Sequence, residues 1–224
     1  MSTYMTEEEQ IEAIKKWWRR YSTPITIILS VILLAASGYR YWQWHENKVN
    51  TQASNAYEHL MVAFSNHDNK AIKAYANQLT QQFSDTVYAD AARMTLAKLY
   101  VSRDKLDKAL EPLEYVASHS RLKALRQVAR LRIARIMAAQ KAYDKAIGEL
   151  ATVDDDSYMP LINELKGDIY TATGNYQQAA VAYKDAISEA RTNGIGNQYL
   201  EMKTNELATL TQSMNVGASA PRSA

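Results

Sequence analysis

The feature that most constrains this chain is a stretch of nineteen residues, 21–39, that carries no charge and lies between Arg20 and Arg40. An α-helix rises about 1.5 Å per residue, so a helix from Tyr21 to Trp44 measures about 36 Å. That length is enough to cross a hydrocarbon core of about 30 Å together with its interfaces. The sequence therefore predicts a transmembrane helix over residues 21–44.

Tryptophans flank this stretch on both sides, with Trp17 and Trp18 before it and Trp42 and Trp44 after it. Indole rings favour the two headgroup layers, so we expect these four side chains to lie at the membrane interfaces. A cleaved signal peptide is the alternative, with its apolar region at 25–36. The acidic residues of the N-terminal segment and the aromatic residues after the apolar stretch favour a retained anchor.

The basic residues around the stretch are unevenly distributed. Lys15, Lys16, Arg19 and Arg20 precede it, whereas only Arg40 and Lys48 follow closely. Because positive residues stay on the cytoplasmic side, we expect the N-terminus in the cytoplasm and the bulk of the chain on the far side of the membrane. In a Gram-negative bacterium, the far side of the inner membrane is the periplasm. The predicted parts are a cytoplasmic tail (1–20), the anchor (21–44), a periplasmic domain (45–213) and a disordered tail of small residues (214–224).

The composition of the rest of the chain indicates an all-α fold. Seven glycines and four prolines in 224 residues supply too few turns for a sandwich or barrel. The absence of cysteine excludes disulfides, thiolate zinc sites and iron–sulfur clusters. A formal net charge of +2 gives no bulk electrostatic basis for nucleic-acid binding.

Three segments share one pattern, in which a small residue is followed by further apolar residues at offsets of 3, 12, 16 and 19. Small residues on two successive helices let an antiparallel pair approach closely, and stacked pairs bury a continuous core. The pattern therefore predicts helix pairs. The three sets are Ala97, Tyr100, Ala109, Leu113 and Val116; Ala134, Met137, Ala146, Leu150 and Val153; and Gly167, Tyr170, Ala179, Tyr183 and Ala186.

The third set, running from Gly167 to Ala186, resembles tetratricopeptide repeats (TPRs) most strongly. A possible earlier pair, around 55–64 and 69–83, matches the pattern only through Ala71 and Tyr75. We expect a single N-terminal transmembrane helix followed by a TPR-like α-solenoid of about three to four helix pairs. A last helix, from about Asn197 to Ser213, is expected to cover the open end.

No constellation of residues indicates an enzyme, and we expect no catalytic residue, metal or cofactor. Gly194-Ile-Gly196 lacks the preceding strand of a dinucleotide site, so we interpret it as a helix stop. His67-Asp68 suggests an acid–base or metal element, but its polar surroundings favour an inter-helix turn. Asp154-Asp155-Asp156 lacks the alternating ligands of a calcium loop and is interpreted as a turn before a helix starting near Ser157.

Residues 121–145 contain eight basic residues and only one acid, Asp144. On a helical wheel, one flank carries Lys123, Arg126 and Arg130, and the other carries Arg121, Arg132 and Arg135. One interpretation is a solvated helix whose arginine stems cover neighbouring side chains. The other is a contact surface for an acidic partner or anionic headgroups, formed by Arg121, Arg126, Arg130, Arg132 and Arg135.

The order of the elements resembles the YfgM family, whose members are ancillary subunits of the bacterial Sec translocon. The most specific parts are the run Glu-Glu-Glu-Gln-Ile-Glu-Ala-Ile-Lys-Lys-Trp-Trp at 7–18 and the repeat at 167–186. The resemblance implies an inner-membrane protein with two partners, the translocon and a membrane-anchored periplasmic isomerase-like chaperone. It also implies that the protein assists translocating polypeptides. It brings no catalytic or contact residues. A membrane-tethered scaffold for another envelope assembly is the alternative, and an enzyme is the third.

Overall fold

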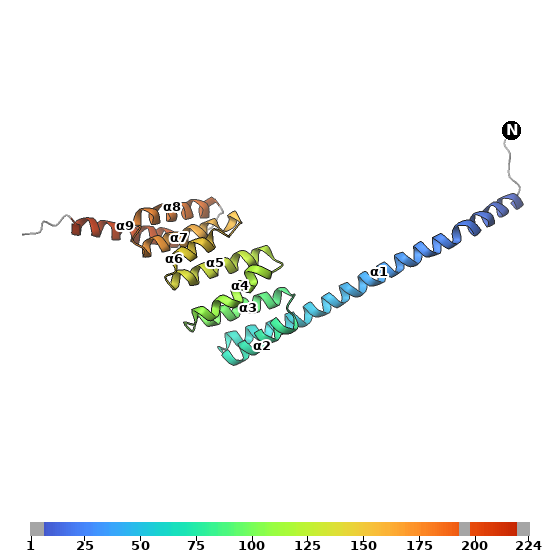
Figure 1. The fold of residues 1–224 in the computed structure, drawn as a ribbon, viewed down its shortest axis with the longest axis horizontal. Coiled ribbons are helices and arrows are strands. Elements are labelled where there is room, and N and C mark those ends of the chain that lie inside the picture. Colours follow the sequence, from blue (N-terminus) through green and yellow to red (C-terminus); the bar gives the residue numbers. More distant parts are fainter. Residues whose placement is uncertain (1–6, 193–197, 219–224) are drawn as a thin grey trace, which may run out of the picture. The chain divides into compact units, whose positions relative to one another are not determined.

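The computed structural model describes the backbone of residues 7–192 and 198–218. Every regular element in these ranges is helical, which confirms the predicted fold class. The chain divides into two compact units, Met1–Gln52 and Ala53–Ala224, and the first helix belongs to both (Figure 1).

Helix α1 (Glu7–Ser65) contains residues 7–20 of the predicted tail and the whole predicted span without interruption. It includes Pro24, and the Thr26 hydroxyl donates a hydrogen bond to the Ser22 carbonyl at 2.7 Å, one turn earlier. In the described part of the chain, α1 is the one helix long and apolar enough to cross a membrane. The final turns of α1 then form the first helix of the repeat domain.

In its described residues, the repeat domain has four antiparallel helix pairs followed by one further helix (Figure 1). The end of α1 pairs with α2 through a shared core cluster. Helix α3 pairs with α4, α5 with α6, and α7 with α8, while α9 packs on α8. This confirms the upper end of the predicted number of pairs. The bounds are α2 (Asn69–Gln82), α3 (Val87–Val101), α4 (Leu106–His119), α5 (Lys123–Ala139), α6 (Tyr143–Leu150), the 3₁₀ helix η1 (Asp156–Tyr158), α7 (Met159–Ala172), α8 (Tyr176–Thr192) and α9 (Gln198–Ala218).

The turn inside each pair has the same backbone geometry. One residue in each turn is left-handed, with φ between 55° and 77°: His67, Asp104, Lys141 and Gly174. Its N–H donates to the carbonyl three residues earlier, and the next N–H donates to the carbonyl five residues earlier, at 2.8–3.2 Å. This is the Schellman arrangement, which satisfies the last carbonyls of a helix. The turns make the four pairs equivalent despite sequence steps of 37, 37 and 33 residues.

The small residues of the repeat pattern lie where the helices of a pair approach each other. Ala97 and Ala109, Ala134 and Ala146, and Gly167 and Ala179 are all buried. At Gly167 the approach is closest, because a Cβ atom there would lie 2.5 Å from Cε1 of Tyr183. The predicted repeat register is therefore confirmed in the last three pairs.

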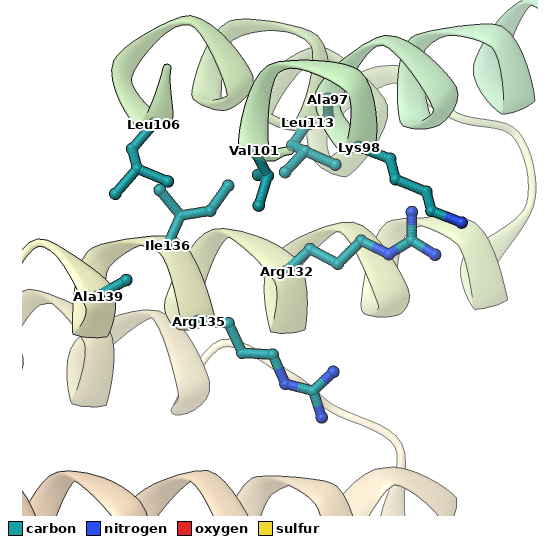
Figure 2. A pocket seen from close by; sticks show the side chains of 9 residues that line it. All are labelled: Ala97, Lys98, Val101, Leu106, Leu113, Arg132, Arg135, Ile136 and Ala139. Atoms are coloured by element: carbon teal, nitrogen blue, oxygen red, sulfur yellow. The ribbon is translucent and has the colours of Figure 1, made fainter. Parts of the chain in front are cut away.

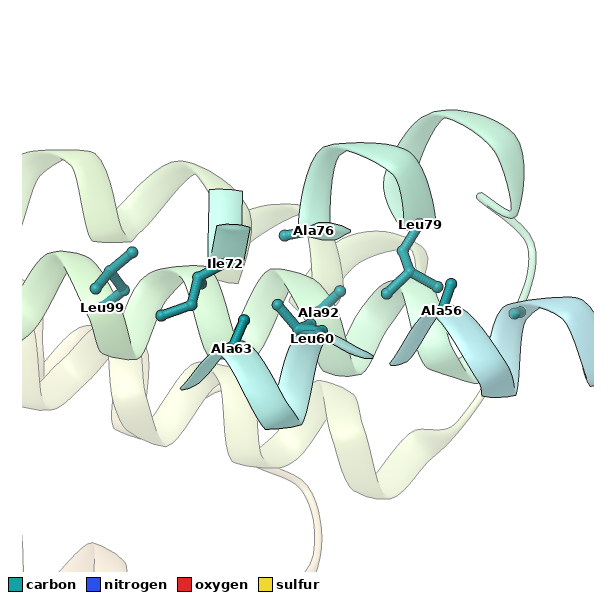
Figure 3. Packing of buried hydrophobic residues seen from close by; sticks show 9 residues of the cluster. Ala56, Leu60, Ala63, Ile72, Ala76, Leu79, Ala92 and Leu99 are labelled. Carbon is teal, nitrogen blue, oxygen red and sulfur yellow. The ribbon is translucent and has the colours of Figure 1, made fainter. Parts of the chain in front are cut away.

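The register of the first pair differs from the prediction through Ala71 and Tyr75. Counting from the left-handed turn residue, the equivalent positions are Leu60, Ile72, Ala76 and Leu79, and all four are fully or almost fully buried (Figure 3). Leu60 and Ile72 are larger than their counterparts in the other pairs. The small-residue signal was therefore absent from the sequence although the pair is present.

The core forms a series of clusters, each shared by consecutive helices. The first joins the end of α1 to α2 and α3, the second joins α3, α4 and α5, and the third joins α5, α6 and α7. Two smaller clusters hold α8 against α9. Burial shared between neighbouring pairs is the expected stabilisation of a solenoid.

The end of the described chain requires one correction. Helix α9 continues to Ala218, so residues 214–218, predicted to belong to a disordered tail, extend the last helix. No proline lies between Ser213 and Ala218, so the helix can continue through these residues although Gly217 disfavours it. Residues 219–224, the glycines of 194–196 and the start predicted at Asn197 lie outside the described residues.

Candidate functional site

Helix α5 carries most of the basic residues singled out in the sequence. One buried side of α5 packs Ala129, Ile133 and Ile136 into the second core cluster, and the other packs Leu131 and Ala134 into the third. Arg126 and Arg130 are half-buried on one flank, and Arg132 and Arg135 are exposed on the other. The helical wheel thus separated Arg126 and Arg130 from Arg132 and Arg135 correctly, whereas Arg121 lies before the start of α5.

The first flank binds neighbouring backbone. The Arg126 guanidinium donates to the Ser120 carbonyl at 2.7 Å, and the Arg130 guanidinium donates to the Thr152 carbonyl. Lys123 forms an ion pair with Asp154 at 3.4 Å. These side chains fasten the turns around α5. Arg121 is exposed and forms no ion pair within the described residues.

The aspartate run lies in the loop between α6 and α7, just before the helix start predicted near Ser157. Gln127 of α5 pairs with Asp154, and Asp155 accepts hydrogen bonds from the Ser157 hydroxyl at 2.6 Å and the Ser157 N–H at 3.0 Å. These hydrogen bonds lower the pKa of the Asp155 carboxyl. The run therefore begins η1 and leads into α7.

The other predicted chemical element, His67-Asp68, is also a turn. His67 is the left-handed residue, and Asp68 Oδ1 accepts hydrogen bonds from the N–H groups of Lys70 and Ala71 at 3.0 Å. Asp68 therefore serves as the N-cap of α2. Within residues 7–192 and 198–218, no three metal-ligating side chains come together.

The second flank of α5 borders an apolar pocket of about 250 Å³ between α3, α4 and α5. Figure 2 shows Val101, Leu113 and Ile136 pointing toward one another across it, with Leu106 and Ala139 toward one end. Lys98 and Arg132 extend their cationic groups toward the other end. We call this feature the α3–α5 pocket; its lining is Ala97, Lys98, Val101, Leu106, Leu113, Arg132, Arg135, Ile136 and Ala139.

The rim of the α3–α5 pocket is basic and carries no acidic residue. Partial burial and the nearby charge of Arg135 lower the pKa of Arg132. Lys98 Nζ lies 4.9 Å above the Phe64 ring. No ion pair among the described residues involves these three cations. Chemically, the pocket offers an apolar floor beside an unneutralised positive edge.

A second exposed surface lies on α1. Trp17, Trp18, Trp42 and Trp44 are 53–60 % exposed, and the large apolar side chains between Ile27 and Leu34 are 55–74 % exposed. Rings pack locally at each end, as between Trp17 and Tyr21 or Tyr41 and Trp44. The predicted interface tryptophans therefore bracket an apolar helix surface that the chain itself leaves uncovered.

A polar network that joins α9 to α7 and α8 was not predicted from the sequence. Lys203 Nζ contacts Glu164 at 2.9 Å and Asp168 at 2.7 Å, and the Tyr183 hydroxyl donates to Asp168 at 2.7 Å. Burial by itself lowers the pKa of Lys203, but hydrogen bonds to the two carboxylates outweigh it and raise that pKa. Residues 35 and 39 positions apart meet here, and no local pattern reports such a contact.

Comparison with known proteins agrees with this architecture. Residues 15–209 match the family described as tetratricopeptide repeat-like domain. Proteins named "Ancillary SecYEG translocon subunit" are 26 % identical in Neisseria gonorrhoeae, 26 % in Escherichia coli and 28 % in Haemophilus influenzae. The alignments cover 92, 93 and 92 % of this chain, respectively, and 100 % of each relative. No solved structure matches the chain. The chain therefore belongs to the tetratricopeptide repeat-like YfgM family, as its sequence resemblance implied.

Proposed function

We propose that this protein is a membrane-anchored ancillary component of the Sec translocon whose repeat domain binds polypeptides without performing chemistry on them. The observation that carries the proposal is the full-length similarity to proteins named as ancillary subunits of SecYEG. In this role the repeat domain lies in the periplasm. There it assists newly translocated proteins together with a membrane-anchored isomerase-like chaperone.

The exposed apolar surface of α1 supports the anchor. A water-exposed band of large aliphatic residues between two aromatic clusters is unfavourable in solution, and a bilayer would cover it completely. Backbone polar groups within the band are satisfied by the continuous helix, which a spanning segment requires. The four interface residues in this proposal are Trp17, Trp18, Trp42 and Trp44.

The charge distribution supports the orientation. The basic residues just before the apolar stretch, Lys15 to Arg20, would remain in the cytoplasm. The repeat domain would then face the periplasm, where polypeptides emerge from the translocon. Its four helix pairs supply an extended surface rather than one enclosed site, as expected of a solenoid that binds other chains.

Membrane tethering would raise the occupancy of weak contacts between the repeat domain and its partners. A repeat surface that binds a polypeptide at about micromolar affinity captures little in dilute solution. Confinement beside a partner supplies an effective concentration on the order of millimolar, so the same contact is then largely occupied. The anchor would therefore contribute to binding without touching the bound segment.

Photocrosslinking in native membranes tests this function. A photoreactive amino acid is placed in the full chain at Trp44, at the edge of the span, and separately at Lys184, an exposed residue of α8. We expect crosslinks from the Trp44 position to translocon subunits and from the repeat domain to the chaperone or translocating chains. Reproducible crosslinks only to another envelope assembly would replace the proposal with the scaffold alternative.

A further inference from the structure

We propose that the α3–α5 pocket binds a short acidic and apolar segment of a partner polypeptide, with an apolar side chain on the pocket floor and carboxylates at Lys98, Arg132 and Arg135. This inference rests on the proposed function and adds the chemistry of the bound segment. The floor of the α3–α5 pocket is apolar. Val101, Leu106, Leu113, Ile136 and Ala139 line a cavity of about 250 Å³, which is enough for one or two large apolar side chains.

The rim of the pocket is complementary in charge to an acidic segment. Three cations stand on the rim, no acidic residue lines the pocket, and no ion pair within the described residues neutralises any of them. The other flank of the same helix differs, because Arg126 and Arg130 bind carbonyls and Lys123 binds Asp154. Positive groups without an acidic partner beside an apolar floor select an anion that carries an apolar group.

The two ends of the pocket differ in chemistry. The cationic groups of Lys98 and Arg132 lie toward one end, and Leu106 and Ala139 lie toward the other (Figure 2). Asp107, next to Leu106, is occupied by a 2.7 Å hydrogen bond from Gln140. A bound segment therefore places its carboxylates at the Arg132 end and its apolar side chain over Val101 and Ile136. A lipid headgroup would satisfy the cations but leave the apolar floor unused, so a peptide is favoured.

The test uses the full chain in nanodiscs of uncharged phosphatidylcholine and a dye-labelled ten-residue peptide. The peptide has a central Leu-Phe pair flanked on each side by two glutamates. Two control peptides replace the glutamates with glutamines or the Leu-Phe pair with two serines. We expect each control peptide to bind at least about tenfold more weakly in fluorescence anisotropy, and high salt to weaken the acidic peptide selectively.

Variants locate the binding. Arg132→Gln with Arg135→Gln should weaken the acidic peptide about tenfold. The charge-matched control, Arg121→Gln with Lys145→Gln, changes two exposed cations outside the pocket and should have little effect. Ala139→Leu keeps every charge and fills the floor, so it should also weaken binding. If circular dichroism shows that the double arginine variant does not fold, the Ala139→Leu variant alone tests the site.

Three outcomes would overturn the inference: equal affinity for all three peptides, equal losses in the two double variants, or unchanged binding by Ala139→Leu. Arginine-dependent binding to phosphatidylglycerol vesicles without peptide binding would assign the cations to a lipid surface instead. Because the assay contains no translocon, its failure would remove the pocket inference and leave the crosslinking test of the proposed function untouched.

Discussion

Left-handed residues at the four equivalent turns differ in how easily they adopt that backbone. Gly174 does so freely, whereas Lys141 has φ 62° and carries a Cβ atom. The left-handed region disfavours a residue with a Cβ atom by about 1–2 kcal/mol. Glycine relieves this strain, but it also raises the conformational entropy of the unfolded chain, which offsets about 0.4–1 kcal/mol of the gain in stability. We therefore predict that Lys141→Gly stabilises the repeat domain by about 0.5–1 kcal/mol, measured by urea unfolding with circular dichroism.

The matched control for this substitution is Lys145→Gly. Lys145 is exposed in the first turn of α6, where glycine destabilises the helix by up to about 1 kcal/mol. The two lysine-to-glycine changes should therefore have opposite signs. Destabilisation by both would show that Lys141 is not held in a left-handed turn.

The close approach at Gly167 gives a second residue-scale prediction. A Cβ atom there would lie within 3.0 Å of three ring carbons of Tyr183, whose side chain is only 4 % exposed and has little room to move. Gly167→Ala should destabilise the chain by about 1–3 kcal/mol in thermal unfolding. Gly148→Ala is the control, because a Cβ atom there meets nothing within 4 Å and should stabilise α6. Stabilisation by both substitutions would contradict the packing.

At the scale of elements, the polar network decides whether α9 stays docked. Lys203→Met leaves the Glu164 and Asp168 carboxylates without their shared cation, and we expect the docking of α9 to lose about 2 kcal/mol. Hydrogen exchange of α9 amides should then accelerate about thirtyfold, while α3 and α4 remain unchanged. Lys184→Met, at an exposed position of α8, should not accelerate α9. Equal exchange in the two variants would contradict the role of the network.

The same network makes the end of the domain sensitive to alkali. Burial raises the pKa of Tyr183 to about 12, and the neighbouring Asp168 carboxylate adds to the shift. The ordinary value is about 10, so the neutral phenol contributes its stability fully below pH 10 and loses it as the pH rises toward 12. We predict that the stability difference between the parent chain and Tyr183→Phe declines by about 1–2 kcal/mol over this range. Parallel pH profiles would contradict it.

The sequence predicted those elements whose signal is local. Spacing of small residues placed the last three helix pairs in register, because small residues at fixed offsets let two antiparallel helices approach closely. The first pair was placed one residue out of register, since Leu60 and Ile72 fill the same positions with larger side chains. The α3–α5 pocket and the Lys203 network were not predicted. Both arise where helices distant in sequence meet, and their geometry depends on how the pairs stack.

At the scale of the whole molecule, one chain carries its apolar residues in two different ways. The repeat domain buries its apolar residues against one another in water. Helix α1 presents its apolar residues outward between two aromatic clusters, which suits a hydrocarbon surround. In the proposed function these two halves act together, because the anchor determines where the repeat domain meets its partners and the repeat surface determines what it binds.

The measurement that tests this account most directly is cysteine accessibility across the membrane. The chain contains no cysteine, so single variants Glu12→Cys and Ser118→Cys each report one exposed site without background from the chain itself. In intact cells, a membrane-impermeant maleimide applied after opening the outer membrane should label Ser118→Cys and leave Glu12→Cys unlabelled until the inner membrane is broken. Labelling of Glu12→Cys alone, or a mature chain that begins near Gly38 and is free of the membrane, would contradict the anchored periplasmic domain.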